Sequence, residues 1–151
     1  MVGLPRKTIF IDRNTVGEPL RASLKDAGIP FVLHDDIPRF TRRTTDAEWL
    51  DYVSGKDWVV VSGDISVKKN FTFLTTLRRT QAQVFILASL NHALRAERAG
   101  MIISAYGEIL RLCHSNTGPK LWVTDASQEF VSVNIKHERG MLARYRRFST
   151  H

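Results

Sequence analysis

Four short apolar runs, separated by segments with helical periodicity, constrain the fold of this chain most strongly. The runs are Thr8–Ile11, Phe31–Leu33, Trp58–Val61 and Val84–Ala88. Their apolar residues are continuous instead of alternating with polar ones, which is typical of strands buried on both faces. Strands joined by helices pair in parallel through right-handed crossovers. The chain therefore predicts an α/β fold, a three-layer sandwich with a central, mostly parallel sheet.

The periodic segments predict four helices, at Pro19–Ala27, Thr45–Val53, Phe71–Arg79 and Ala93–His114. Gly28 would end the first helix, and Asn91 or His92 would cap the last. After these, Leu121–Val123 and Phe130–Val133 predict a β-hairpin, and a basic tail follows at Arg139–His151. A chain of 151 residues is long enough to bury one core without disulfides. We therefore predict a single domain over residues 1–151, in which residues 92–151 add the long helix, the hairpin and the tail.

The composition excludes several classes of protein. Cys113 is the only cysteine, which excludes a disulfide framework and a cysteine-rich zinc site, and it favours the cytoplasm, where thiols stay reduced. No apolar run approaches the ~18 residues of a membrane span, and Asp12 interrupts the first run, which argues against a signal peptide. Residues 1–66 hold nine Lys/Arg and ten Asp/Glu, whereas residues 67–151 hold thirteen and five. This asymmetry would suit a metal site beside a surface for a polyanion.

Acidic residues follow three of the apolar runs at the point where the predicted strands end. Asp12 follows the first run, Asp35 and Asp36 follow the second, and Asp64 follows the third. The carboxyl ends of parallel strands meet at one edge of a sheet, where open α/β sheets bind ligands. Clustered carboxylates need a cation between them, and Mg²⁺ or Mn²⁺ prefers oxygen ligands. The pattern therefore predicts a divalent metal site, with turn or helix capping as the alternative for any single Asp.

The start of the second predicted helix adds two acids. Thr45 and Glu48 fit a capping box, which gives Glu48 a structural role. Asp46 lies three residues before Trp49 and four before Leu50, so it shares the buried face of this helix. We interpret Asp46 as a metal-ligand candidate, with a capping role as the alternative and Glu48 in reserve.

Three polar side chains stand beside these acids in the sequence. Asn14 follows Asp12 by two residues, and it would orient that carboxylate, bind a phosphate or water, or form a plain Asx turn. Ser62 precedes Asp64 by two residues, and it would orient the carboxylate or simply end the strand. His34 is either a proton carrier or, as is more common beside acids, a structural group.

The order and spacing of these motifs resemble those of a PIN-like domain, and most of all those of the small VapC-type toxins. The residues concerned are Ile9-Phe10-Ile11-Asp12-Arg13-Asn14, His34-Asp35-Asp36, Asp46-x-Glu48-Trp49-Leu50 and the run from Trp58 to Asp64. The motifs span Ile9 to about Lys69. The later helix and the hairpin fit the same group more loosely.

The resemblance implies a metal-dependent ribonuclease that hydrolyses RNA phosphodiester bonds with Mg²⁺ or Mn²⁺. By motif match, Asp12, Asp46 and Asp64 would be its catalytic, metal-binding acids. Ser66 stands where many relatives carry a further acid. The fourth ligand is therefore open: Asp36 is the first candidate, with Asp35 and Glu48 in reserve.

An RNA substrate must be held by cations. Arg13 lies beside Asp12, and Lys68 and Lys69 come shortly after Asp64, so these three are the expected phosphate contacts. Further candidate phosphate contacts precede Asp46, with a solvated loop as the alternative: Arg39, Arg42 and Arg43. Phe40 and Phe71 are possible platforms for base stacking, with core packing as the alternative. The expected partners are RNA and a cognate antitoxin, with a homodimer as a further candidate and no membrane.

Two other functions compete with the nuclease. One is a non-catalytic RNA-binding or protein-interaction domain that kept the fold. The other is a Mg-dependent phospho-acceptor signalling module, which also places carboxylates at strand ends. That second class wants paired acids after the first strand and a Lys after the fifth, and the single Asp12 fits it badly.

Overall fold

A computed structural model of the chain describes residues 3–13 and 18–135. Asn14 and the basic tail from Arg139 to His151 lie outside the described residues. The strands are β1 (Ile9–Ile11), β2 (Phe31–Leu33), β3 (Val59–Ser62), β4 (Gln83–Ile86), β5 (Lys120–Thr124) and β6 (Phe130–Val133). The α-helices are α1 (Glu18–Asp26), α2 (Asp46–Ser54), α3 (Phe71–Arg78) and α4 (Arg95–Ser115). Short 3₁₀ helices lie at η1 (His34–Asp36), η2 (Ile65–Lys69) and η3 (Leu90–His92).

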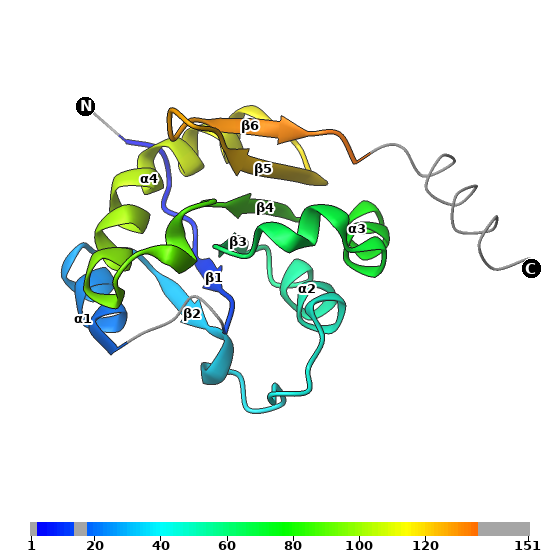
Figure 1. The fold of residues 1–151 in the computed structure, drawn as a ribbon, viewed down its shortest axis with the longest axis horizontal. Helices are drawn as coiled ribbons and strands as arrows, with labels where there is room; N and C mark the ends of the chain where they lie inside the picture. Colours follow the sequence, from blue (N-terminus) through cyan, green and yellow to red (C-terminus); the bar gives the residue numbers. More distant parts are fainter. Residues whose placement is uncertain (1–2, 14–17, 136–151) are drawn as a thin grey trace, which may run out of the picture.

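All six strands form one sheet in the order β2-β1-β3-β4-β5-β6. The first five are parallel to their neighbours, and β6 pairs antiparallel with β5. The predicted α/β architecture, the mostly parallel sheet and the terminal hairpin are therefore confirmed. The sheet is extended at one edge by the hairpin, as Figure 1 shows.

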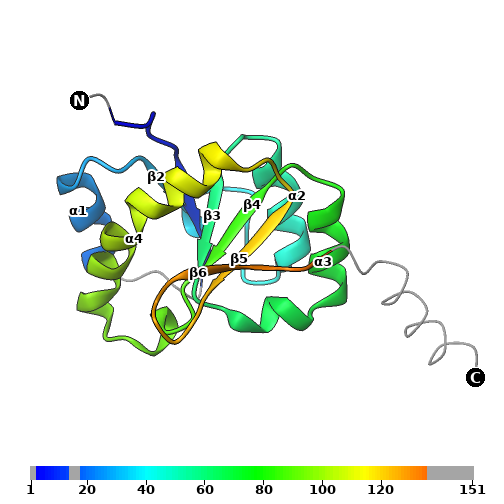
Figure 2. The same cartoon turned by 90° about the horizontal axis from the view of Figure 1, so that it is seen from above.

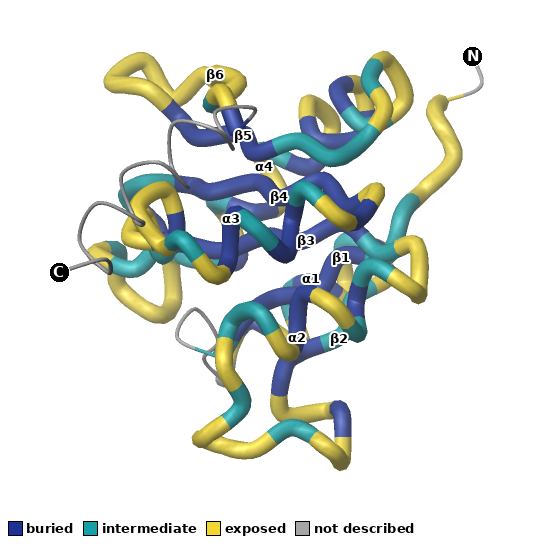
Figure 3. The backbone as a smooth tube through the Cα atoms, turned by 90° about the vertical axis from the view of Figure 1, so that its right-hand side faces the viewer, coloured by how far each residue is buried: buried dark blue, intermediate teal, exposed yellow. Residues whose placement is uncertain are grey.

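Strands β1, β3, β4 and β5 are buried on both faces, because they send alternate side chains into two separate cores, whereas β6 at the edge is partly exposed. Ile9 and Ile11 of β1 pack with α1 and α4, whereas Phe10 between them packs with α2 and α3. All three are fully buried. Figure 1 shows the two helix pairs on opposite sides of the sheet, and Figure 3 shows the inner strands mostly in the colour of buried residues, with β6 largely exposed. Double-sided burial explains why the strand sequences are continuously apolar.

The crossover from β4 to β5 differs from the expected handedness. From β2 through β3 and β4 to β5, the chain moves in one direction across the sheet. Helices α2 and α3 cover one face during these steps, but α4 covers the other face beside α1 (Figure 2). The connection through α4 is therefore opposite in hand to the other three. Our prediction of right-handed crossovers throughout is wrong at this point, where burying α4 against α1 overrides the usual preference.

Helix ends follow local chemistry in most places. Thr45 caps α2 by accepting from the backbone N–H of Glu48 at 3.2 Å, and Glu48 Oε2 accepts from the Thr45 N–H at 2.8 Å, which confirms the capping box. Gly28, with a φ of 69°, follows the end of α1 as predicted. The cap of α4 was predicted wrongly, because Leu94 occupies that position without a side-chain hydrogen bond.

The strand order reverses direction between β1 and β3. From β1 the chain moves outward to β2 under α1, and from β3 it moves the other way under α3 on the opposite face. The crevice beyond the carboxyl ends of strands at such a switch point is where open α/β sheets bind ligands.

Within residues 3–13 and 18–135, none of the helices has both the length and the apolar character that crossing a membrane requires.

Candidate active site

Asp12 lies at the carboxyl end of β1 beside the switch point. Asp12 is only 4% exposed. The parallel pairing of Ile11 with Val61 brings the next residues of the two strands, Asp12 and Ser62, to the same level. The Ser62 hydroxyl donates a hydrogen bond of 2.7 Å to Asp12 Oδ2. The sequence left open whether Ser62 orients the Asp64 carboxylate or ends the strand. Ser62 is the last residue of β3, and the carboxylate that its hydroxyl contacts belongs to Asp12 instead of Asp64.

Asp64 follows β3 two residues after Ser62. Its backbone N–H donates to Ser62 Oγ at 3.0 Å, so one hydroxyl connects both strand ends. The carboxylate caps η2, where Asp64 Oδ1 accepts from the backbone N–H of Ser66 at 3.0 Å and from its hydroxyl at 2.5 Å. The capping alternative for a strand-end Asp thus describes Asp64 in this structure.

Asp46 begins α2 and is oriented by a neighbour on the same helix. The indole Nε1 of Trp49 donates to Asp46 Oδ1 at 3.0 Å. Trp49 is itself held in the core, where it is 2% exposed and its ring lies 5.1 Å from that of Phe10. The i, i+3 spacing on the helix therefore places Asp46 at the rim of the core, as its sequence position predicts.

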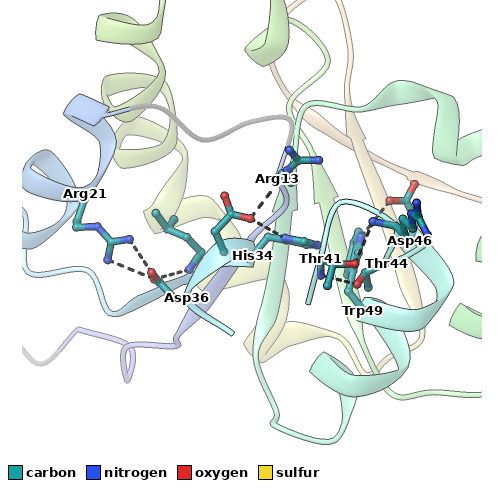
Figure 4. A network of polar contacts seen from close by, with 11 residues as sticks. Arg13, Arg21, His34, Asp36, Thr41, Thr44, Asp46 and Trp49 are labelled. Carbon is teal, nitrogen blue, oxygen red and sulfur yellow. Dashed lines mark hydrogen bonds and ion pairs between the residues drawn. The ribbon is translucent and has the colours of Figure 1, made fainter. Parts of the chain in front are cut away.

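Asp12 and Asp46 line the same small pocket, which we call the Asp12–Asp46 pocket. Its volume is about 80 Å³, and the residues around it are Asp12, Arg13, His34, Thr41, Arg42, Thr44, Asp46 and Trp49. Figure 4 shows the Thr41, Thr44, Asp46 and Trp49 side chains gathered near the start of α2. Asp64 is not part of its lining, so the structure brings two of the three predicted acids together and leaves the third at the adjacent strand end.

The three candidates for a fourth acid lie in different surroundings. Asp36 pairs with Arg21 through contacts of 2.6 and 3.2 Å and accepts from the Leu33 N–H at 3.1 Å (Figure 4). The Arg21 guanidinium holds the pKa of the Asp36 carboxyl below its ordinary value. Asp36, our first choice, is therefore directed away from the Asp12–Asp46 pocket, and Glu48 is engaged in the capping box.

Asp35 lies closer to the candidate site than Asp36 does. Its Oδ1 is 3.1 Å from His34 Nδ1 and 3.9 Å from Arg13 Nε. His34 and Arg13 both line the Asp12–Asp46 pocket. The imidazole is almost fully buried and its ring lies 5.1 Å from that of Phe40. Asp35 thus positions a cation and an imidazole beside the acids.

The oxygen atoms of the Asp12–Asp46 pocket suit a hard cation. Carboxylates from Asp12 and Asp46, with hydroxyls from Thr41 and Thr44, are the donor types that Mg²⁺ and Mn²⁺ accept. In the part of the chain that the structure describes, however, no group of three or more His, Cys, Asp or Glu residues could hold a metal ion. The donor set therefore fits the predicted metal in kind, with two acids placed instead of three or four.

The predicted RNA contacts surround this region. Arg13 and Arg42 line the pocket, whereas Lys68 and Lys69 are exposed at the end of η2, the helix that Asp64 caps. The arginines of the loop before α2 were candidates in the sequence, but Thr41, Thr44 and Trp49 were not expected in the site. Of these three, only Trp49 could have been predicted from the sequence, because it follows Asp46 by three residues on the same helix.

A comparison with protein-family models decides the family. The model described as PIN like domain matches residues 8–89, which is more than half of the chain. The chain belongs to the PIN-like domain family. The match covers β1 to β4 and every predicted acid of the site, and it ends before α4 and the hairpin of this PIN-like protein. Domains of this family are generally nucleases and typically use divalent metals. No curated protein and no solved structure matches the chain.

Proposed function

We propose that this PIN-like protein is a metal-dependent ribonuclease that hydrolyses phosphodiester bonds of RNA. One observation carries the proposal: Asp12 and Asp46 line one polar pocket at the switch point of the sheet. Neighbouring carboxylates repel each other, and a divalent cation between Asp12 and Asp46 would relieve this repulsion together with the arginines of the same lining. Membership of a nuclease-type family supports the same conclusion.

Asp12 and Asp46 would hold Mg²⁺ or Mn²⁺, with Asp64 as the third acid and Asp35 as the best-placed fourth. When bound, such an ion supplies a hydroxide near neutral pH and stabilises charge on phosphate oxygens. The chain's own groups orient these ligands. Ser62 holds Asp12, and the Trp49 indole holds Asp46.

Cations around the acids would hold the RNA backbone. Arg13 and Arg42 face the pocket, and Lys68 and Lys69 extend the positive charge along η2. Contacts of this kind position a substrate without reading its sequence.

We further propose a toxin role in the cytoplasm, with a cognate antitoxin as the partner that restrains the nuclease. The supporting observation is the motif resemblance to VapC-type toxins.

We also propose that residues 1–151 act as one domain, because β5 and β6 complete the sheet that β1 begins. A homodimer is a secondary proposal. A phospho-acceptor module fits less well, since Thr124 and Asp125 stand at the end of β5 where that class needs a Lys.

The decisive experiment compares Asp12→Asn with Asp26→Asn, which removes one exposed acid from the last residue of α1, a helix that contributes no residue to the lining of the Asp12–Asp46 pocket. Purified proteins are incubated with single-stranded RNA in Mg²⁺, in Mn²⁺ or in EDTA. We expect the parent and Asp26→Asn to cleave RNA only with metal, and Asp12→Asn to lose at least about a hundredfold in rate, equivalent to about 2.7 kcal/mol. Asn keeps an acceptor for Ser62, so thermal unfolding should confirm an intact fold.

Cleavage by Asp12→Asn at the rate of the parent would contradict the site assignment. A folded parent that binds RNA but cleaves none in either metal would instead favour the non-catalytic RNA-binding alternative. Growth arrest on expression, relieved by Asp12→Asn, tests the toxin role separately.

A further inference from the structure

A second, larger pocket lies beside the Asp12–Asp46 pocket. Its volume is about 370 Å³, and it is lined by Arg39, Phe40, Thr44, Glu48, Asp51 and Tyr52. We call it the Tyr52 pocket. It falls in the size range of small-molecule sites, about 300–1,000 Å³, whereas the 80 Å³ of the Asp12–Asp46 pocket lies below that range. A nucleobase attached to a phosphate at the acids therefore needs a separate place.

The Tyr52 pocket offers planar groups on which a base can stack. The Phe40 and Tyr52 rings meet edge to face with centroids 5.2 Å apart. The Arg39 guanidinium lies 5.1 Å and the Lys56 ammonium 5.2 Å from the Tyr52 ring centroid. Both cations lie over the Tyr52 ring, so a base reaches this ring by displacing one of these two exposed side chains, or it stacks on the Arg39 plane. Aromatic rings and arginine planes are both surfaces on which proteins stack unpaired bases.

Two carboxylates in the lining of the Tyr52 pocket would favour a base over a phosphate group. A phosphate would be repelled by Glu48 and Asp51, so these acids favour the hydrogen-bond donors of a base over the backbone. Glu48 Oε2 already accepts from the Thr45 N–H at 2.8 Å, whereas Asp51 is exposed on the adjoining turn of α2. A carboxylate accepts two parallel N–H donors, and among the four RNA bases guanine presents two such adjacent donors on its Watson–Crick edge.

The Tyr52 pocket adjoins the Asp12–Asp46 pocket through a shared residue. Thr44 lines both pockets, and its hydroxyl accepts from the backbone N–H of Thr41 at 2.8 Å. The Phe40 ring lies 5.1 Å from the His34 ring, which reaches the Asp12–Asp46 pocket from the other side. A single nucleotide can thus place its phosphate at the acids and its base against Tyr52.

We propose that the Tyr52 pocket is a subsite for an unpaired guanine of single-stranded RNA, with Tyr52 as the stacking platform and Asp51 as the acceptor. The proposal deepens the nuclease function and rests on it for the position of the scissile phosphate. It assigns a base preference to a protein whose other proposed RNA contacts are phosphate contacts.

The test measures binding and not cleavage, in the Asp12→Asn background so that the RNA stays intact. Fluorescence anisotropy compares a short fluorescein-labelled oligouridylate with the same oligonucleotide carrying one central guanosine. We expect the guanosine to raise affinity about tenfold. Tyr52→Ala should weaken binding of the guanosine oligonucleotide by about tenfold, as is typical of losing one stacked base. Tyr52→Phe keeps the ring and should retain the affinity.

Asp51→Asn provides the sharper variant because Asp51 is exposed and its loss leaves the aromatic rings in place. It should abolish the guanosine preference while binding oligouridylate as well as before or slightly more tightly, because one negative charge is removed. Asp26→Asn, on α1, should retain the preference. Equal affinity of the Asp12→Asn protein for both oligonucleotides, or an unchanged preference in Asp51→Asn, would overturn the guanine subsite.

The two proposals fail separately. Guanosine-dependent binding in a protein that cleaves no RNA would support the subsite and overturn the nuclease. Metal-dependent cleavage without any base preference would support the nuclease and overturn the subsite.

Discussion

The hydroxyl of Ser62 donates to the carboxylate of Asp12 at 2.7 Å across two parallel strands, and the same oxygen accepts the backbone N–H of Asp64 at 3.0 Å. A single side chain therefore connects the Asp12 carboxylate to the backbone of Asp64, another predicted catalytic acid. Both strand ends depend on it, because Ser62 is 1% exposed and Asp12 is 4% exposed.

Ser62→Ala should lower both stability and RNA cleavage. The change removes a hydrogen bond to a buried carboxylate, so we expect the free energy of unfolding to fall by about 1–3 kcal/mol in urea titrations. Ser54→Ala is the matched control, because the Ser54 hydroxyl donates only to the Asp51 carbonyl of its own helix, and its effect should stay within about 0.5 kcal/mol. Equal stability of the two variants would show that Ser62 does not hold Asp12.

Trp49→Phe should separate positioning from packing. Phenylalanine keeps an aromatic ring near Phe10 but removes the indole N–H that orients Asp46. Trp122→Phe is the control, since its Nε1 donates to Gln83 Oε1 at 3.2 Å in the other core. Both variants should lose about 1–3 kcal/mol in urea unfolding. Only Trp49→Phe should also slow RNA cleavage, by about tenfold or more, because a misplaced ligand is catalytically expensive.

A common loss of activity in Trp49→Phe and Trp122→Phe would mean that reduced stability, and not the orientation of Asp46, explains the effect. Unchanged cleavage by Trp49→Phe would contradict the role of Asp46.

Gly63→Ala should destabilise the switch point. A Cβ atom on Gly63 would stand 2.4 Å from Asn91 Oδ1 and 2.9 Å from the Asn91 backbone nitrogen. Because backbone must move, we expect thermal and urea unfolding to show a loss of about 1–3 kcal/mol. Gly107→Ala in α4 meets nothing within 4 Å and should raise stability by about 0.5–1 kcal/mol. The same sign for both substitutions would contradict the close approach at Gly63.

Cys113 should be unreactive in the folded protein. Burial raises the pKa of its thiol from 9.0 to about 11, so at pH 8 the thiolate fraction falls about 100-fold. Alkylation by iodoacetamide at pH 8 should be slow in buffer and fast in urea. Because the folded pKa lies above the unfolded one, the stability linked to this group is present below pH 9 and decreases as pH rises from 9 toward 11. Alkylation at the same rate with and without urea would contradict this environment.

Much of the fold can be predicted from local sequence patterns. Continuous apolar runs such as Val59–Val61 can be satisfied only by double-sided burial, and Thr45 with Glu48 and Gly28 mark helix ends by local hydrogen bonding and by a positive φ. The handedness of the connection through α4 could not be predicted from local patterns, because it depends on whether α4 packs beside α1 or beside α3. The sequence of α4 does not indicate which of the two faces it covers.

The sequence by itself determined which acids stand at strand and helix ends, since those positions follow from periodicity along the chain. Only the tertiary structure decided which of them meet. Asp46 reaches the Asp12 pocket because Trp49 anchors α2 in the core, whereas Asp36 is drawn to Arg21 and Asp64 caps η2. The physical reason is that a carboxylate takes the strong donor that the fold brings nearest to it. For Asp46 and Asp64 that donor lies two or three residues along the chain, whereas for Asp12 and Asp36 it lies on another element, β3 or α1.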